Sequence, residues 1–396
     1  MTESLWTRQE LGLKANVVKC GYALNYVGGK RKISHEILNT ILDDCNIEKP
    51  VFYDIFGGGA AMSFQAADFG LKAIYNDLNK DLYALFKDIQ VLKSNECIDF
   101  FKNNFITKKL FNVWQDSKDY FALKTALVNC YSYGGAMGFY AFNPINHHIK
   151  KHCHYAICKG YLESFEAIFA YYAGKTNNSP LCSLIFDFYE HIKSVDWLER
   201  YRSWIDFFVK FEGLICLDTD FWHSELGKSD LFSKVAEIKQ SEILAHINNK
   251  LGKEYKHIKC LDSFDSTITS VKQISSFLNI LKLCDFEKYD SIEWHNKDFR
   301  DFEIKHSPDE CVIYNDIPYI SVGNEIYKEN LKNKFPFDEF CDWARKLAKK
   351  GYNVYCSEYE MPQDFKVLKE IDYKSTMNRA VGFTNREVKE RVFKCC

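Results

Sequence analysis

A short apolar run followed by three consecutive glycines is the segment that most constrains the fold. Val51-Phe-Tyr-Asp-Ile-Phe56 has the aromatic and β-branched residues of a buried strand, and Gly57-Gly58-Gly59 interrupts it. Residues 60–69 then carry small and helix-forming residues, and residues 72–76 predict a second strand. Strand, glycine turn, helix and strand in this order predict half of a doubly wound α/β sheet.

The same kind of pattern returns near the other end of the chain. Residues 310–315 predict a buried strand, residues 337–350 an amphipathic helix and residues 353–359 the next strand. Gly351 is the expected stop of that helix. An α/β domain is therefore predicted to use both ends of the chain.

The segment between these two parts has a different character. Residues 147–260 are rich in aromatic residues and predict mostly helices. The simplest organisation is one α/β domain, in parts 1–146 and 261–396, which is split by an inserted helical domain at 147–260.

Composition restricts the class of protein. With 396 residues, of which 46% are hydrophobic, the chain can bury a substantial core. No apolar run reaches membrane-spanning length, and the first residues lack a signal peptide's pattern. The 15 cysteines include no C-x-x-C pair and are interpreted as reduced thiols. A cytoplasmic protein that does not engage membranes is expected. The net charge of −2 means that nucleic-acid binding would need a local basic surface.

Polar residues follow three of the predicted strands. Asp54 and the glycine turn fit a cofactor that needs close approach of the backbone. Asp77 ends the next strand, and an acid about 20 residues downstream suits hydrogen bonds to ribose hydroxyls. The run Asn315-Asp-Ile-Pro-Tyr319 places acceptors beside an aromatic ring, which suits a base turned out of its helix. Taken singly, each element also fits an ordinary turn.

The order of four motifs is more specific than any of them alone. Tyr26-Val-Gly-Gly-Lys30, Asp54-Ile-Phe-Gly-Gly-Gly59, Asn76-Asp-Leu-Asn79 and Asp316-Ile-Pro-Tyr319 occur in this sequence. This set resembles the DNA adenine methylase family of amino-methyltransferases, and the glycine-rich residues 132–138 resemble phage-type members. The resemblance implies a Rossmann-like fold that uses S-adenosylmethionine, releases S-adenosylhomocysteine and carries an inserted target-recognition domain.

The resemblance also implies the residues of the cofactor pocket. They are Tyr26, Lys30, Asp54, Phe56, Gly57, Gly58, Gly59, Asp77, Asp298, Phe299 and Asp316. Lys30 is expected near the carboxylate of the cofactor, and Asp77 near its ribose. Asp298 and Phe299 are expected at its adenine, and no metal is required.

The catalytic element that the resemblance implies is Asp316, Ile317, Pro318 and Tyr319. The Asp316 carboxylate and the Ile317 carbonyl would accept the two amino hydrogens of an adenine extruded from double-stranded DNA, and Tyr319 would stack on that base. The family has Pro where Ile317 stands. Because Ile also supplies a carbonyl, activity is expected to survive, and Ile317→Pro should be tolerated.

Several alternatives stay open at this point. A degenerate relative could bind DNA or cofactor without turnover, and a related enzyme could methylate another base, although cytosine-specific members usually carry Ser where Asp316 stands. A cluster of His147, His148, His152, Cys153 and His154 has no partner cluster with zinc spacing, so no metal is predicted. Residues 228–259 contain seven lysines, which could face phosphates or form a solvated helix face. The setting could be a phage or a restriction-modification system.

Overall fold

The structure is a computed structural model that describes residues 22–26, 28–135, 137–168, 187–215, 271–318, 335–374 and 387–396. The chain divides into two compact units. The sheet unit contains residues 1–93, 113–140 and 276–396, and the helical unit contains residues 94–112 and 141–275. The chain thus crosses between the units more often than one insertion requires. The target-recognition role of residues 147–260 remains a prediction.

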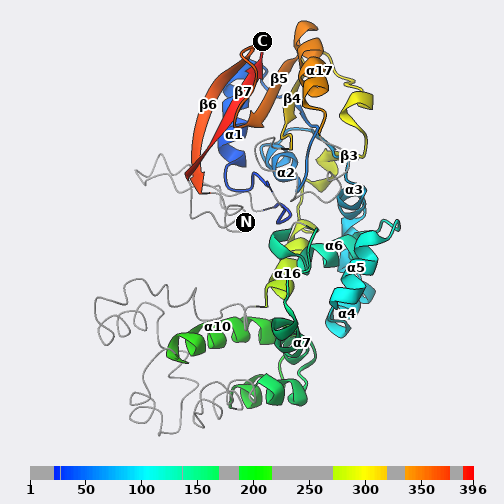
Figure 1. Cartoon of the computed structure of the whole chain (residues 1–396), viewed down its shortest axis with the longest axis vertical. Coiled ribbons are helices and arrows are strands. Elements are labelled where there is room, and N and C mark those ends of the chain that lie inside the picture. The colour runs from blue at the N-terminus through cyan, green and yellow to red at the C-terminus, as the bar shows by residue number, and fades with distance from the viewer. Residues whose placement is uncertain are drawn as a thin grey trace, which may run out of the picture. The chain divides into compact units, whose positions relative to one another are not determined.

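A seven-stranded sheet forms the centre of the sheet unit, in the order β3-β2-β1-β4-β5-β7-β6 (Figure 1). The strands are β1 Val51–Asp54, β2 Ala73–Asn76, β3 Ile292–His295, β4 Cys311–Asn315, β5 Asn353–Glu358, β6 Phe365–Lys374 and β7 Glu387–Cys395. The first five strands of this order are parallel, and β7 is antiparallel to both β5 and β6. The predicted mixed α/β fold is confirmed, and the sheet is consistent with a methyltransferase fold.

Helices account for most of the remaining described chain. The α-helices are α1 Ser34–Cys45, α2 Ala61–Asp68, α3 Lys80–Lys87, α4 Asn95–Asn103, α5 Lys108–Asp116, α6 Ala122–Cys130, α7 Pro144–Lys159, α10 Trp197–Ile215, α16 Lys272–Leu283 and α17 Phe337–Lys349. The 3-10 helices are η1 Ile89–Lys93, η2 Tyr133–Gly135, η4 Tyr289–Ser291 and η5 Phe299–Asp301. Asp88 separates α3 from η1, and the apolar residues Leu82, Leu85, Phe86 and Ile89 of these two helices are buried.

Both faces of the central strands are covered, which explains why those strands are almost continuously apolar. Tyr53 and Ile313 pack with Phe340 of α17 in one core cluster. Neighbouring residues of a strand point to opposite faces of the sheet. The side chain of Tyr355 points to the face opposite this cluster, where it contacts α1. Its hydroxyl donates to the Asp44 carboxylate of α1 at 2.8 Å. Figure 1 shows α1 and α17 on either side of the strands that they cover.

The described part of the helical unit is held by buried polar contacts as well as by apolar packing. His154 of α7 is fully buried, and its Nε2 lies 3.0 Å from the Phe101 carbonyl of α4. Burial lowers the pKa of His154 to about 4, so the ring is neutral. Arg200 of α10 donates from Nε to the Ile157 carbonyl at 2.6 Å. In the residues that the structure describes, no group of His, Cys, Asp or Glu could hold a metal ion.

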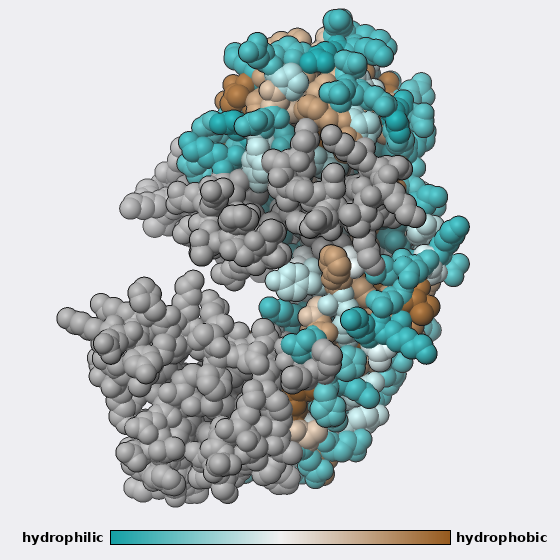
Figure 2. All heavy atoms as spheres, in the orientation of Figure 1, coloured by the Kyte–Doolittle hydropathy of each residue, from teal (hydrophilic) through white to brown (hydrophobic). Residues whose placement is uncertain are grey.

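The surface of the described residues is mixed in character. On the face seen in Figure 2, hydrophobic residues form small groups between hydrophilic ones. No helix in the described ranges is both long and apolar enough to span a membrane. The described cysteines are free and, apart from Cys396, buried. The lysine-rich residues 228–259 lie outside the described ranges.

Candidate active site

A cleft of about 610 Å³ opens at the carboxyl ends of the parallel strands. The chain runs outward from β1 to β2 and β3, and then returns to β4 on the other side of β1. Open α/β sheets bind their ligands at such a reversal of strand order. The volume lies within the range of about 300–1,000 Å³ that is usual for small-molecule sites.

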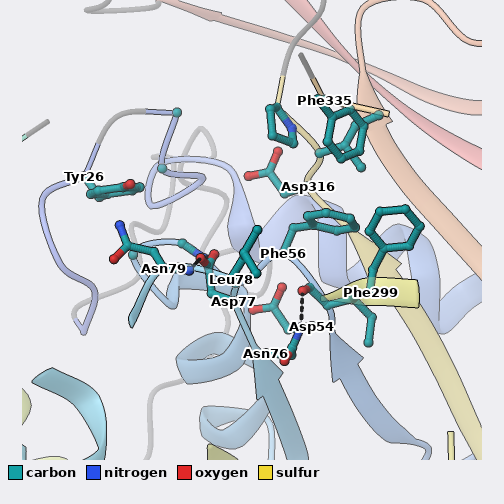
Figure 3. A pocket seen from close by; sticks show the side chains of 18 of the residues that line it. Tyr26, Asp54, Phe56, Asn76, Asp77, Leu78, Asn79, Phe299, Asp316 and Phe335 are labelled. Atoms are coloured by element: carbon teal, nitrogen blue, oxygen red, sulfur yellow. Dashed lines mark hydrogen bonds between the residues drawn. The ribbon is translucent and has the colours of Figure 1, made fainter. Parts of the chain in front are cut away.

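The predicted site residues meet in this one cleft. Its lining includes Tyr26, Lys30, Asp54, Phe56, Gly57, Gly58, Gly59, Asp77, Asp298, Phe299, Asp316, Ile317 and Pro318. Figure 3 shows Tyr26, Asp77 and Asp316 around it, although they come from distant parts of the sequence. Tyr319 lies outside the described residues. The roles of the individual residues remain predictions.

The glycine turn and Asp77 form one wall of the cleft. Backbone N–H groups hold the Asp77 carboxylate in place there. A Cβ atom on Gly57 would lie 2.2 Å from the ring of Tyr75, so no larger residue fits there without a shift. The Asp77 carboxylate accepts the Gly58 N–H at 2.8 Å and the Asn79 N–H at 2.8 Å. Loss of water raises the pKa of Asp77, while both hydrogen bonds lower it. These contacts hold the carboxylate in one orientation beside the turn.

Asp54, at the end of β1, is a buried carboxylate with one unsatisfied oxygen. Its Oδ2 accepts the backbone N–H of Ser63 at 3.1 Å and the Ser63 hydroxyl at 2.6 Å. Its Oδ1 has no hydrogen-bond partner in the described part of the chain. Burial raises the pKa of Asp54 to about 7, and the Asp316 and Asp77 carboxylates contribute to this rise. Such an acceptor fits a ligand that brings a donor or a positive charge.

An aromatic wall borders another part of the cleft. The rings of Phe56 and Phe299 are 5.6 Å apart, and the ring of Phe335 is 5.7 Å from Phe56. Asp298 caps the start of η5, and its carboxylate accepts two N–H groups of the Arg300 side chain at 2.9 and 2.7 Å. Apolar rings next to an anchored carboxylate can bind a flat heterocycle that has hydrogen-bond donors.

Asp316 directly follows β4 and is paired with Lys30. The Lys30 Nζ lies 2.6 Å from the Asp316 Oδ1 and also donates to the Gly28 carbonyl at 3.2 Å. The Asp316 side chain is 19% exposed. Burial raises its pKa to about 6 even though the Lys30 ammonium acts in the opposite direction. The carboxylate is therefore ionised at neutral pH but poised to bind a proton.

The next residue, Ile317, has a buried side chain. Its side chain is 1% exposed and belongs to the core cluster that contains Ile55 and Phe299. The departure from the family motif thus places an aliphatic side chain in the core that supports the cleft.

Several lining residues were not singled out from the sequence, namely Met62, Gln115, Asp116, Phe335 and Pro336. Met137 and Gly138 also line the cleft and fall within or beside the glycine-rich stretch noted in the sequence. The Gln115 amide donates to the Gly138 carbonyl at 2.9 Å and also to that of Met137. This contact ties α5 to the loop, and no local pattern indicates it.

Comparison with known proteins supports the family suggested by the ordered motifs. Residues 26–178 match the family model described as D12 class N6 adenine-specific DNA methyltransferase. No curated protein matches the chain. The family match confirms the resemblance, together with the predictions of an enzyme and of adenine-N6 methylation in DNA.

Proposed function

We propose that this adenine-N6 DNA methyltransferase takes its methyl group from S-adenosylmethionine bound in the cleft and transfers it to an adenine extruded from double-stranded DNA. One observation carries the proposal. Asp316 lines the same cleft as the Gly57–Gly59 turn and the aromatic wall of Phe56 and Phe299. Donor and acceptor can therefore occupy adjoining parts of one site.

Four features of the cleft support S-adenosylmethionine as the donor. Asp54 carries a buried oxygen without a partner, which suits the ammonium of the cofactor's methionine part. Asp77 is held by two backbone N–H groups and offers its remaining lone pairs to ribose hydroxyls. Phe56 and Phe299 offer an apolar wall for the adenine. Lys30 lines the cleft beside Asp316, and its ammonium suits the cofactor's carboxylate.

The sulfonium of the bound cofactor supplies an activated methyl group. The protein must make the adenine amino nitrogen more nucleophilic, because its lone pair is delocalised into the adenine ring. The Asp316 carboxylate and the Ile317 carbonyl accept the two amino hydrogens in this proposal, which draws the nitrogen toward a tetrahedral shape and aligns its lone pair. Lys30 keeps Asp316 in position through the 2.6 Å contact.

The position of Asp316 also supports base extrusion. Its side chain is only 19% exposed, so an amino group inside a stacked duplex would not reach it. We therefore propose that the target adenine leaves the duplex and enters the cleft, with Tyr319 as the predicted stacking partner. The cytoplasmic location and the phage or restriction-modification setting remain predictions.

A methyl-transfer assay tests the proposal. The protein is incubated with methyl-labelled S-adenosylmethionine and duplex DNA, and the DNA is digested to nucleosides. We expect the label in N6-methyl-2′-deoxyadenosine. Label in methylcytosine would overturn the choice of base. Failure of calorimetry to detect S-adenosylmethionine binding to the folded protein would overturn the donor.

A further inference from the structure

Arg300 lines the cleft next to Asp298, and the proposed function gives it no task. Its side chain reaches two carboxylates at once. Nε and Nη2 donate to Oδ1 and Oδ2 of Asp298 at 2.9 and 2.7 Å, and Nη1 donates to Oε2 of Glu339 at 3.0 Å. Arg300 belongs to η5 and Glu339 to α17, so the guanidinium connects the start of η5 to that helix.

The pair of Arg300 and Asp298 fixes an orientation more than it adds stability. An ion pair near the surface contributes little, because water screens the charges and two long side chains lose freedom. Here, however, two N–H groups of one planar guanidinium meet the two oxygens of one carboxylate. Such a fork sets the plane of the carboxylate as well as its distance. The side chain of Arg300 is 51% exposed and that of Asp298 is 20% exposed, so the arginine lies on the outer side of the pair.

The hydrogen bonds of Asp298 leave one of its oxygens able to accept a further donor. The hydrogen bonds from Arg300 lower the pKa of Asp298, so the carboxylate is ionised at neutral pH and offers about two lone pairs on each oxygen. Oδ1 accepts the backbone N–H of Arg300 at 2.9 Å as well as its Nε–H, so both of its lone pairs are used. Among the residues that the structure describes, Oδ2 accepts the Nη2–H alone. A ligand in the cleft can therefore donate one N–H group to Oδ2.

An aromatic wall adjoins this carboxylate, because Phe299 is the next residue. The Phe299 ring lies 5.6 Å from that of Phe56 and 6.2 Å from that of Phe335, and Figure 3 shows the three side chains together. The guanidinium of Arg300 lies 5.7 Å from the centre of the Phe299 ring, so it borders the same wall. Such a wall suits a flat heterocycle. Adenine carries an amino donor at the position where hypoxanthine carries a carbonyl acceptor.

We propose that Arg300 is a positioning residue that holds the Asp298 Oδ2 toward the amino group of the cofactor's adenine and so makes the cleft selective for adenosyl ligands. This inference rests on the proposed function, in which S-adenosylmethionine is the donor. A carboxylate held in one orientation accepts the amino N–H and repels a carbonyl oxygen at the same place. Arg300 contacts neither the transferred methyl group nor the target base in this arrangement, so its effect belongs to cofactor binding.

Calorimetry of the full-length protein with two ligands tests the proposal. S-adenosylhomocysteine and S-inosylhomocysteine differ in the purine, where the amino group of the first is replaced by a carbonyl oxygen in the second. The wild-type protein should bind the adenosyl ligand at least about tenfold more tightly. Arg300→Ala should lower this ratio by about threefold or more, mainly through weaker binding of the adenosyl ligand. Equal binding of the two ligands by the wild type, or an unchanged ratio in the folded variant, would overturn the inference.

Arg300→Lys separates the orientation of the carboxylate from the charge beside it. Lysine keeps the positive charge but replaces the planar fork with one ammonium. The ratio of the two affinities should therefore fall nearly as far as in Arg300→Ala. A ratio equal to that of the wild type would show that charge alone is sufficient and would contradict the positioning role. A role of Arg300 in folding alone would weaken the binding of both ligands by the same factor, which would also contradict the proposal.

Arg345→Ala is the matched control, because Arg345 makes the same kind of fork elsewhere in the sheet unit. Its Nε and Nη2 donate to the Asp364 carboxylate at 2.6 and 3.0 Å, and its guanidinium lies 5.9 Å from the centre of the Phe365 ring. The described lining of the cleft does not include Arg345, so this variant should keep the wild-type ratio. A fall equal to that of Arg300→Ala would overturn the assignment to Arg300. Failure of the proposed donor is a separate result, in which the wild-type protein binds neither ligand, and it would remove this inference as well.

Discussion

The two sides of the cleft hold their carboxylates in different ways. Asp77 receives two backbone N–H groups at 2.8 Å, and the neighbouring glycine turn leaves no room for a Cβ atom at Gly57. Asp316 is instead held by the side chain of Lys30, with a third buried acid, Glu390, within 3.8 Å of the same ammonium. The Asp77 side is held by backbone N–H donors, whose number does not change with pH. The Asp316 side is held by ionisable side chains, which can gain or lose a proton.

Because of this difference, the Asp77 side and the Asp316 side of the cleft suit different tasks. Backbone donors cannot titrate, so the side with Asp77 suits selective binding of a ligand. Ionisable side chains in a buried place can exchange protons, so the side with Asp316 suits the chemical step. Changes on the first side should therefore alter cofactor affinity, and changes on the second side should alter turnover.

The largest effect is expected from Asp316→Ala. The variant removes the proposed acceptor for an amino hydrogen in the transition state, so turnover should fall by at least about 100-fold. Affinity for S-adenosylmethionine should change much less. Rapid-quench methyl transfer and calorimetry measure the two quantities. Substantial remaining turnover in the folded variant would remove Asp316 from the chemical step.

Gly57→Ala should disturb the rigid side. The new Cβ atom would lie 2.2 Å from the Tyr75 ring, and such overpacking costs about 1–3 kcal/mol in the free energy of unfolding. The displaced turn should also weaken cofactor binding. Chemical denaturation and calorimetry provide the measurements.

Gly70→Ala is the matched control for this change. Gly70 has φ +81° and no atom within 4 Å of an added Cβ, so only backbone strain is expected. Both variants should lose stability, but only Gly57→Ala should lose affinity for S-adenosylmethionine. Equal loss of affinity in both would show that general destabilisation is the cause.

Asp77→Ala should weaken cofactor binding without a comparable loss in the chemical step. Hydrogen bonds that involve a charged group contribute about 1.5–3 kcal/mol, which corresponds to roughly 10- to 150-fold in affinity. Calorimetry on the folded variant measures this loss, with the exposed Asp372→Ala of β6 as a control. Unchanged affinity would exclude Asp77 from the cofactor site.

The affinity for S-adenosylmethionine should rise with pH between about 6 and 8 because of Asp54. Burial raises the pKa of Asp54 to about 7, and only the ionised form attracts the cofactor's ammonium. Calorimetry at several pH values should show this rise, and Asp54→Asn should flatten it. A wild-type affinity that stays constant over this range would contradict the role of Asp54.

Asp54 should also make the stability of the folded protein depend on pH. Stability should fall as pH rises, whereas cofactor affinity should increase. The folded-state pKa of about 7 lies above the usual aspartate value of 3.8, so the folded protein binds more protons than the unfolded chain between these two pH values. The contribution of Asp54 to stability is therefore present at low pH and is lost as pH rises toward 7. Denaturation at pH 5 and 7 should show a smaller decline in Asp54→Asn than in the wild type.

Local sequence patterns predicted four of the seven strands, β1, β2, β4 and β5, and many of the residues that line the cleft. The glycine turn, Asp77 and Asp316 each follow a strand, and parallel strands bring their carboxyl ends to one edge. The Lys30–Asp316 pair joins residues 286 positions apart, and no periodicity could indicate it. Glu390 was missed for a different reason, since a glutamate in a strand usually predicts an exposed position.

The division of the chain into two units also depends on long-range contacts that local sequence patterns do not indicate. Residues 94–112 belong to the helical unit, although the sequence placed them in the first part of the α/β domain. Their amphipathic helices fit either unit equally well, because an apolar helix face specifies burial but not the partner. Only long-range packing decides between the two.

The smallest effect on turnover is expected from Ile317→Pro. Pro keeps the carbonyl that the proposed mechanism uses, and its fixed φ matches the family's own residue at this position. Pro also restricts Asp316 to extended conformations, which the end of β4 already supplies. Turnover per folded molecule should therefore equal or exceed that of the wild type. Stability should fall by about 1–3 kcal/mol, because the Ile317 side chain is 1% exposed in a packed core. Ile317→Val is the control, since it keeps the backbone N–H and should lose less stability at unchanged turnover. A large drop in turnover with Pro but not with Val would mean that the backbone N–H of Ile317 is used, and the side assigned to chemistry would then depend on its backbone as well.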